Sequence, residues 1–311
     1  MDRRRFLETT GRWVGASLAG TWLPAARPPA AAAASAASHP DLVSVTGAPR
    51  PAVHRALATL GGLGRFLAPG QVVVIKPNAS FLAPPEWGAT THPQVLRGLL
   101  EACFEAEARR VLVVDHTMGT QAERCFERTG IAATVAAFEK AKLVSLDRER
   151  AYETVAVPAG ESLHETAIAT AVRKADLFIN LPTAKSHAAT GVSFGLKNLM
   201  GLVWDRQVFH SSMDIHVGIA DLATVLRPQL TILDAVHLLQ TGGPAGPGEV
   251  ETLNRVIAGV DPVAVDAYAV GLTHWNRQIL QAEQIPFLQH AARRGIGTLA
   301  WRDLTLAEIE A

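Results

Sequence analysis

Cysteine is nearly missing from this chain, which has two among its 311 residues, Cys103 and Cys125. Two thiols are too few for a four-thiolate iron–sulfur cluster or zinc site, so we expect no iron–sulfur cluster. The two cysteines could pair in an oxidising compartment. Two lone cysteines in neighbouring helical segments are more often small, buried apolar residues.

The chain also lacks net charge, with 29 basic and 29 acidic residues. Without a basic field it is not expected to bind nucleic acid. Its apolar runs all fall short of the ~20 residues that cross a bilayer, so we expect no transmembrane domain. A hydrophobic fraction of 48% over 311 residues can bury a large core, which indicates a folded, soluble protein.

The first 37 residues have the composition of an export signal. Arg3, Arg4 and Arg5 precede Phe-Leu, an apolar stretch follows, and a tract of alanines ends near Ala37. This pattern resembles a twin-arginine signal, so we expect residues 1–37 to be a signal peptide read by the twin-arginine translocation machinery. The mature protein is then periplasmic or otherwise extracytoplasmic. That route carries folded proteins, often with a cofactor inserted, which makes a divalent metal or another cofactor worth considering.

Strand and helix patterns alternate through the rest of the chain. Apolar runs without internal alternation, separated by amphipathic helices, predict an α/β fold with a mostly parallel sheet and helices on both faces. This is a doubly wound, Rossmann-like three-layer sandwich, and the absence of a linker favours a single domain over 38–311. Strands are expected at 42–46, 72–75, 111–114, 143–146, 154–157, 177–179, 230–233 and 256–259. Helices are expected at 52–60, 93–108, 121–140, 163–174, 215–226 and 262–272.

The stretch at 176–187, DLFINLPTAKSH, begins as an apolar run and ends in polar residues. It predicts a buried strand that leads into a loop at its carboxyl end, where open α/β sheets bind ligands. Several hydrogen-bond donors gather there and in the glycine-bounded turn that follows, which favours an anionic ligand. A solvated loop with turn glycines is the alternative. The donors are Lys185, His187, Lys197 and Asn198.

Two other predicted strands also end in polar residues. Lys76-Pro77-Asn78 places a cation and an amide side by side where proline stops a strand, although a plain turn is the alternative. Asp115 and His116 follow the next strand. An Asp–His pair at a strand end can act as a general base and its partner, or ligate a metal. Asp115 can also simply cap the next helix.

The charged segment at 204–216 holds a weaker candidate site. His210, Asp214 and His216 could supply metal ligands. The His-x5-His spacing is not a recognised zinc pattern, however, and satisfied surface histidines are common.

Two further segments could contribute to a site. Gly243 lies in a glycine- and proline-rich loop that could close over a ligand as a backbone-lined wall, with a long ordered turn as the alternative. Asp261 before Pro262 is expected to cap a helix. Asp266, one turn later, faces the same end and keeps a possible site role.

Several of these motifs together resemble the domain of unknown function 362 family. They run in order through 40–275: KPN at 76–78, THP at 91–93, VVD at 113–115, NLP at 180–182 with Lys185 and His187, GLKNLMG at 195–201, the Gly243-Pro244 loop and DPVAVD at 261–266. Many members are described as iron–sulfur proteins with ferredoxin-like cysteine motifs. This chain departs from them because it has no Cys-x-x-Cys. The resemblance implies no general reaction.

Two classes of function remain open, because the chain has no nucleophile elbow, complete triad order or nucleotide fingerprint. The favoured hypothesis is an exported enzyme that binds a small phosphate- or carboxylate-bearing ligand at the carboxyl edge of the sheet. The alternative is a non-catalytic maturation or electron-transfer protein that holds a cofactor or metal for a partner. In the enzyme hypothesis the ligand is bound by Lys76, Asn78, Lys185, Lys197, Asn198 and Gly243, and protons are handled by Asp115, His116 and His187.

Overall fold

The computed structural model describes residues 39–119 and 121–311. The expected signal peptide at 1–37 lies outside these residues. His39–Ala311 forms one compact unit. None of the helices in the described ranges is long and apolar enough to cross a membrane.

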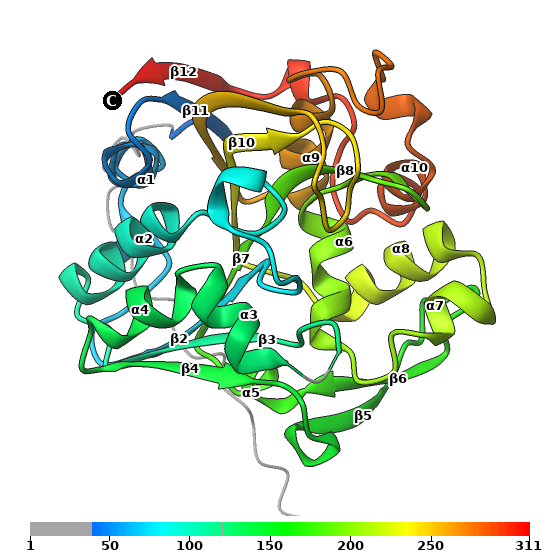
Figure 1. The fold of residues 1–311 in the computed structure, drawn as a ribbon, viewed down its shortest axis with the longest axis horizontal. Helices are drawn as coiled ribbons and strands as arrows, with labels where there is room; N and C mark the ends of the chain where they lie inside the picture. Colours follow the sequence, from blue (N-terminus) through cyan, green and yellow to red (C-terminus); the bar gives the residue numbers. More distant parts are fainter. Residues whose placement is uncertain (1–38, 120) are drawn as a thin grey trace, which may run out of the picture. The chain divides into compact units, whose positions relative to one another are not determined.

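A mostly parallel sheet forms the centre of this unit (Figure 1). In spatial order its strands are β12 (Leu306–Glu310), β1 (Leu42–Thr46), β11 (Val250–Gly259), β10 (Leu230–Leu239), β7 (Leu177–Leu181), β2 (Val72–Pro77), β3 (Arg110–Asp115) and β4 (Ala141–Ser145). The pairs from β10 to β4 are parallel, and β11 runs antiparallel to both of its neighbours. Beside β10, β8 (Thr183–His187) pairs in parallel with it and antiparallel with β9 (Gly191–Ser193).

Helices cover both faces of the sheet (Figure 1). Successive side chains of β2 point to opposite faces, so Val73 and Ile75 enter one core and Val74 enters the other. The first core packs under α1 (Pro49–Thr59), α2 (Pro93–Glu105), α3 (Ala122–Arg128) and α4 (Ile131–Ala136). The second packs under α6 (Gly195–Asn198), α8 (Ile215–Val225), α9 (Pro262–Val270) and α10 (Pro286–Arg293). The predicted three-layer α/β fold is confirmed.

One predicted helix, at 163–174, is wrong. This segment contains β6 (Glu165–Ala169) and only a short α5 (Thr170–Arg173). β6 pairs antiparallel with β5 (Tyr152–Ala156) in a separate two-stranded sheet, so the strand predicted at 154–157 is real but lies outside the central sheet. Asp221 on α8 accepts hydrogen bonds from three backbone N–H groups at 161–163, which holds the turn between these strands against the core.

Other differences have local causes. The helix predicted at 121–140 is interrupted at Gly130, whose φ of 75° ends α3 before α4 begins. The polar sequence of β8 gave no strand signal, although all five of its residues are buried. Cys103 in α2 and Cys125 in α3 are both free and buried, and burial raises the pKa of each thiol.

The order of the strands reverses direction at β2. The chain leaves β2 for β3 and β4 on one side and returns through β7 and β10 on the other. Ligands of open α/β sheets bind at such a reversal, outside the carboxyl ends of the strands. Lys76, Asp115 and Asn180 lie at or next to the carboxyl ends of β2, β3 and β7, so the polar residues noted in the sequence meet at this reversal.

Candidate functional site

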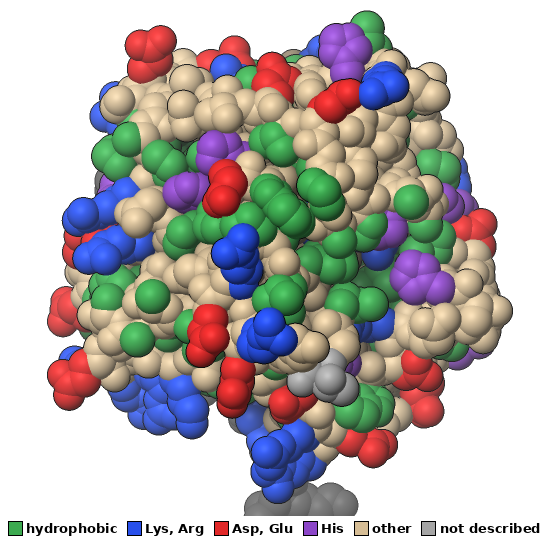
Figure 2. All heavy atoms as spheres, viewed as in Figure 1, with side chains coloured by type: hydrophobic (Ala, Val, Ile, Leu, Met, Phe, Trp, Pro, Cys, Tyr) green, Lys and Arg blue, Asp and Glu red, His purple; other side chains and the backbone are tan. Residues whose placement is uncertain are grey.

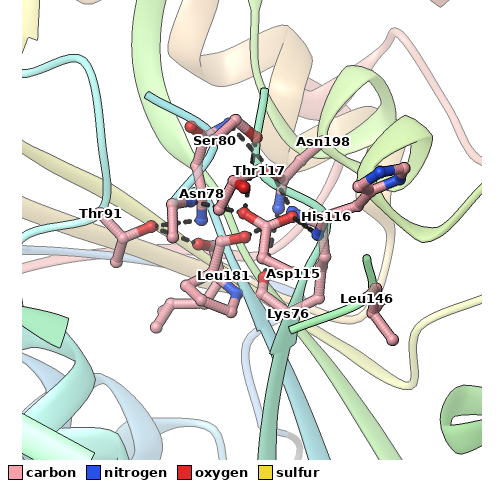
Figure 3. A network of polar contacts seen from close by, with 12 residues as sticks. Lys76, Asn78, Ser80, Thr91, Asp115, His116, Thr117, Leu146, Leu181 and Asn198 are labelled. Carbon is pink, nitrogen blue, oxygen red and sulfur yellow. Dashed lines mark hydrogen bonds and ion pairs between the residues drawn. The ribbon is translucent and has the colours of Figure 1, made fainter. Parts of the chain in front are cut away.

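A buried ion pair joins the carboxyl ends of β2 and β3 (Figure 3). Lys76 Nζ lies 2.8 Å from Asp115 Oδ1, and the two side chains are 1% and 0% exposed. Lys76 Nζ also donates to Asn198 Oδ1 (3.0 Å) and to the Pro77 carbonyl (2.5 Å), so each of its three N–H donors has an acceptor. Burial lowers the pKa of Lys76, and the charge of Asp115 opposes this effect.

The carboxylate of Asp115 also accepts hydrogen bonds from backbone N–H groups. Ala79 N donates to its Oδ2 (2.6 Å) and His116 N to its Oδ1 (2.8 Å). Its described contacts include no imidazole, so the structure does not bring Asp115 into the expected partnership with a histidine ring. A Cβ at Gly201 would lie 2.6 Å from Asp115 Oδ1, which explains why this position is glycine.

Asparagine side chains extend the network from Lys76 across the sheet edge. Asn198 Oδ1 accepts from Asn78 Nδ2 (3.0 Å) as well as from Lys76, and Asn198 Nδ2 donates to Asn180 Oδ1 (2.8 Å). Asn180 Nδ2 in turn donates to the Gly195 carbonyl at the start of α6 (2.9 Å). The network therefore fixes α6 relative to β2 and β7.

The second buried lysine of this region, Lys185, has a different environment. It lies on β8, is 1% exposed, and donates to Asn78 Oδ1 (3.0 Å) and to the Ala89 carbonyl. The ring of Phe81 lies 4.6 Å from its Nζ. Burial, and then the charges of Lys197 and Lys76, lower the pKa of Lys185 well below its ordinary value.

A pocket of about 460 Å³ opens beside this network. Figure 2 shows the face over α6 and α7 (Val208–Ser211), where Lys, Arg and His side chains lie among apolar ones. Cations dominate the lining: within the described part of the chain its acidic residue is the exposed Asp205. The polar lining includes Asn78, Ser80, His116, Lys185, His187, Ser193, Lys197, Asn198, Arg206 and His210, and the apolar lining includes Phe81, Met118, Met200, Trp204 and Pro244.

The charged groups of the pocket act on one another. Burial, and then the charge of Arg206, lower the pKa of Lys197 to about 8. Arg206 donates to the carbonyls of His116 (2.8 Å) and Thr117 (2.9 Å), which holds the loop after β3 against the pocket. Within residues 39–119 and 121–311, Lys197 and Arg206 form no ion pair with a carboxylate, and an anion would relieve their mutual repulsion.

The two predicted proton-handling histidines are both in this pocket. His187 Nδ1 accepts from Ala189 N (3.1 Å), so the neutral ring carries its proton on Nε2. Burial, and then Lys197 and Lys185, lower the pKa of His187 to about 3. His116 stacks on Trp204 at 5.7 Å between ring centroids, and its Nδ1 lies 3.1 Å from the hydroxyl of Tyr152.

The three proposed metal ligands do not gather. Asp214 caps α8 by accepting from His216 N (2.8 Å), and His216 stacks on Phe287. His210 instead lines the pocket from α7. No group of three His, Cys, Asp or Glu side chains suited to a metal occurs among residues 39–119 and 121–311. The local spacing of these residues places them on two helices with separate roles.

Asp261, which precedes α9, and Asp266, within α9, have supporting roles. Asp261 accepts from Val263 N and Ala264 N (both 2.9 Å), so it caps the helix as expected. Asp266 accepts from Gly195 N (2.7 Å) and Leu196 N (2.9 Å) and thereby positions the first turn of α6. Burial raises the pKa of Asp266 to about 7.

The loop at Gly243 reaches the pocket through Pro244, and Gly243 itself is not among the lining residues. Gly243 N donates to Ser186 Oγ (3.1 Å), and the next residue, Pro244, lines the pocket. A Cβ at Gly243 would lie 1.9 Å from the Ser186 carbonyl, so no larger residue fits at this contact.

The structure brings most of the predicted site together. Asn78, Lys185, His187, Lys197, Asn198 and His116 line the pocket, and Lys76 and Asp115 lie directly behind it. Sequence reasoning missed Arg206 and Ser193 as lining residues. Arg206 was visible only as one member of a charged segment, and Ser193 becomes significant because β9 pairs it with Lys185.

Comparisons with known proteins agree with the motifs. The family model described as domain of unknown function (DUF362) matches residues 73–271. A thylakoid-associated protein of Synechocystis sp. is 27% identical over 217 residues, which are 68% of this chain and 65% of that protein. This chain therefore spans somewhat less than two thirds of the relative's length.

Among solved structures, the lactate racemase apoprotein from Thermoanaerobacterium thermosaccharolyticum has a TM-score of 0.43 and 16% identity, over 62% of this chain and 49% of that one. A structural genomics protein from Thermotoga maritima has a TM-score of 0.41 and 12% identity, over 61% and 51%. The family match extends over most of the chain and includes the pocket residues from Asn78 to Pro244. The chain is thus a member of the DUF362 family.

Proposed function

We propose that this protein is an exported enzyme that binds a small organic anion, bearing a phosphate or a carboxylate, in the pocket at the carboxyl edge of the sheet. The observation that carries the proposal is the lining of the pocket, to which Lys197 and Arg206 contribute positive charge while its acidic member among the described residues is the exposed Asp205. Buried or half-buried cations without counter-charges are costly to maintain, and a bound anion supplies the missing charge.

The size and the apolar wall of the pocket indicate an organic ligand. Small-molecule pockets have volumes of about 300–1,000 Å³ and combine apolar walls with a few polar groups. A pocket of about 460 Å³ has room for more than the anionic group itself. Phe81, Met118 and Trp204 suit an acyl or aromatic body.

In this proposal, different residues bind the anion and transfer the proton. Lys197 and Arg206 hold the anion, and the network of Lys76 and Asn198 keeps α6 in place behind them. His187 is neutral in the free protein, because its pKa is about 3. An anion bound beside it raises that pKa and makes the ring a better proton carrier.

The test uses isothermal titration calorimetry with phenyl phosphate and benzoate at two salt concentrations. Binding is expected, with an affinity that falls as salt rises, because exposed ends of the cationic lining are screened. Lys197→Met should weaken binding, and Lys174→Met, at an exposed position outside the lining, should leave it unchanged. Equal affinities in both variants would contradict the site.

A second comparison separates binding from turnover once a substrate is known. His187→Gln keeps a donor at this position and should leave binding largely intact while abolishing turnover. A variant that binds and turns over like the parent would show that His187 does not transfer the proton.

A further inference from the structure

We propose that Lys185 acts as a neutral amine that forms an imine with a carbonyl-bearing organic anion in this pocket. The inference rests on the proposed anion site and adds the substrate class, a 2-oxo acid or a phosphorylated carbonyl compound. The two buried lysines at the sheet edge, Lys76 and Lys185, differ in their hydrogen-bond acceptors.

Lys76 has the contacts of an ammonium ion. Its three N–H donors meet three acceptors, one of which is the carboxylate of Asp115 at 2.8 Å. Lys185 is equally buried but has two described acceptors, Asn78 Oδ1 and the Ala89 carbonyl, and both are neutral. Two acceptors match the two N–H donors of an uncharged amine and leave its lone pair free.

The surroundings of Lys185 also disfavour its charged form. No carboxylate within the described ranges forms an ion pair with it, and of the charges that act on it Lys197 and Lys76 oppose its charged form while Asp115 favours it. Burial, and then the charges of Lys197 and Lys76, lower its pKa well below the ordinary value. Nucleophilic lysines are activated in this way, by an apolar setting or a neighbouring cation. The ring of Phe81 attracts a charge, but such a contact is weaker than the ion pair that Lys76 has.

The position of Lys185 suits attack on a bound substrate. It lines the pocket on the same face of β8 as His187, two residues along the strand. Ser193 is its cross-strand partner on β9 and also lines the pocket. Lys197 lines the same pocket and supplies a positive charge for the carboxylate or phosphate of the substrate.

The step needs no other reactant. The Lys185 nitrogen attacks the carbonyl carbon and forms a C–N bond, and a proton moves from nitrogen to the former carbonyl oxygen. The carbinolamine then loses this oxygen as water, which carries away the remaining proton of the nitrogen, and a neutral C=N bond remains. His187 Nε2–H and the Ser193 hydroxyl are lining groups that can donate a hydrogen bond to the departing oxygen.

The experiment traps the imine by reduction. The protein is incubated with pyruvate, phenylpyruvate or dihydroxyacetone phosphate and sodium cyanoborohydride, and the modified lysine is located by peptide mass spectrometry. One of the three probes is expected to label Lys185 selectively. Lys140, Lys142 and Lys174 are exposed and serve as internal controls for unselective labelling. Lys185→Met should lose the adduct.

A second measurement on the unmodified sequence keeps the test independent of variants that fail to fold. Competitive acetylation with acetic anhydride over a range of pH follows the fraction of each lysine that is uncharged. Lys185 is expected to reach its full reactivity at a lower pH than the exposed Lys142 and Lys174. Reactivity that rises over the same pH range for all three overturns the inference.

The outcomes separate this inference from the proposed function. If calorimetry shows that a carbonyl probe binds but no adduct forms on Lys185, the imine is overturned and the anion site stands. The imine is also overturned if phenyl phosphate binds and none of the three carbonyl probes binds. If no anion binds, the proposed function fails, and the imine, which rests on it, fails with it.

Discussion

Replacing Lys76 by methionine removes one partner of a buried ion pair and is expected to destabilise the fold strongly. Methionine keeps most of the side-chain volume, so the main change is the loss of the charge. Asp115 then stays fully buried with its hydrogen bonds from Ala79 N and His116 N but without a counter-charge. Water cannot reach it, because its side chain is 0% exposed.

The expected loss of stability is taken from other proteins in which one partner of a buried ion pair was removed. Removing one partner of a buried ion pair costs about 3–5 kcal/mol, a large part of the roughly 5–15 kcal/mol that stabilises a domain. This corresponds to a drop in Tm of roughly 10 °C for a domain of this size class. Neutralising the remaining charge should restore part of the loss, so Lys76→Met with Asp115→Asn is expected to be more stable than Lys76→Met alone.

Urea unfolding followed by circular dichroism measures these differences. Lys142→Met is the control, because Lys142 is exposed on β4 and its loss should change the free energy of unfolding by less than about 0.5 kcal/mol. A Lys76→Met variant within about 1 kcal/mol of the parent would refute the account of the ion pair. A double variant whose loss in free energy of unfolding equals the sum of the two single losses would also refute this account.

Three further predictions concern affinity, packing and export. Anion affinity should fall as pH rises through about 8, because burial lowers the pKa of Lys197 to about 8 and its neutral form offers no charge; calorimetry that finds no change across this range contradicts it. Gly201→Ala should lower the free energy of unfolding by about 1–3 kcal/mol, since its Cβ would lie 2.6 Å from Asp115 Oδ1; an unchanged urea midpoint contradicts it. Replacing Arg4 and Arg5 by lysine should keep the precursor in the cytoplasm, and unchanged periplasmic yield on cell fractionation contradicts it.

The sequence by itself determined the layered fold and much of the polar edge. Apolar strand runs and amphipathic helices are local patterns, so the α/β sandwich could be predicted from them. The placement of Lys185 and His187 on one side of an extended segment follows from the period of a strand, and β8 has this geometry. Asp261 followed by proline likewise specified a helix cap from neighbouring residues alone.

The tertiary structure alone decided which polar groups pair. Asp115 was expected beside a histidine ring, but it binds Lys76, and Asn198 reaches Lys76 across 122 positions in the chain. The segment at 163–174 has an apolar pattern compatible with a helix, yet β6 forms because β5 supplies its hydrogen-bonding partner. Partners so distant in sequence leave no local signal, since their contacts arise only when the strands assemble into the sheet and burial forces each polar group to find a partner.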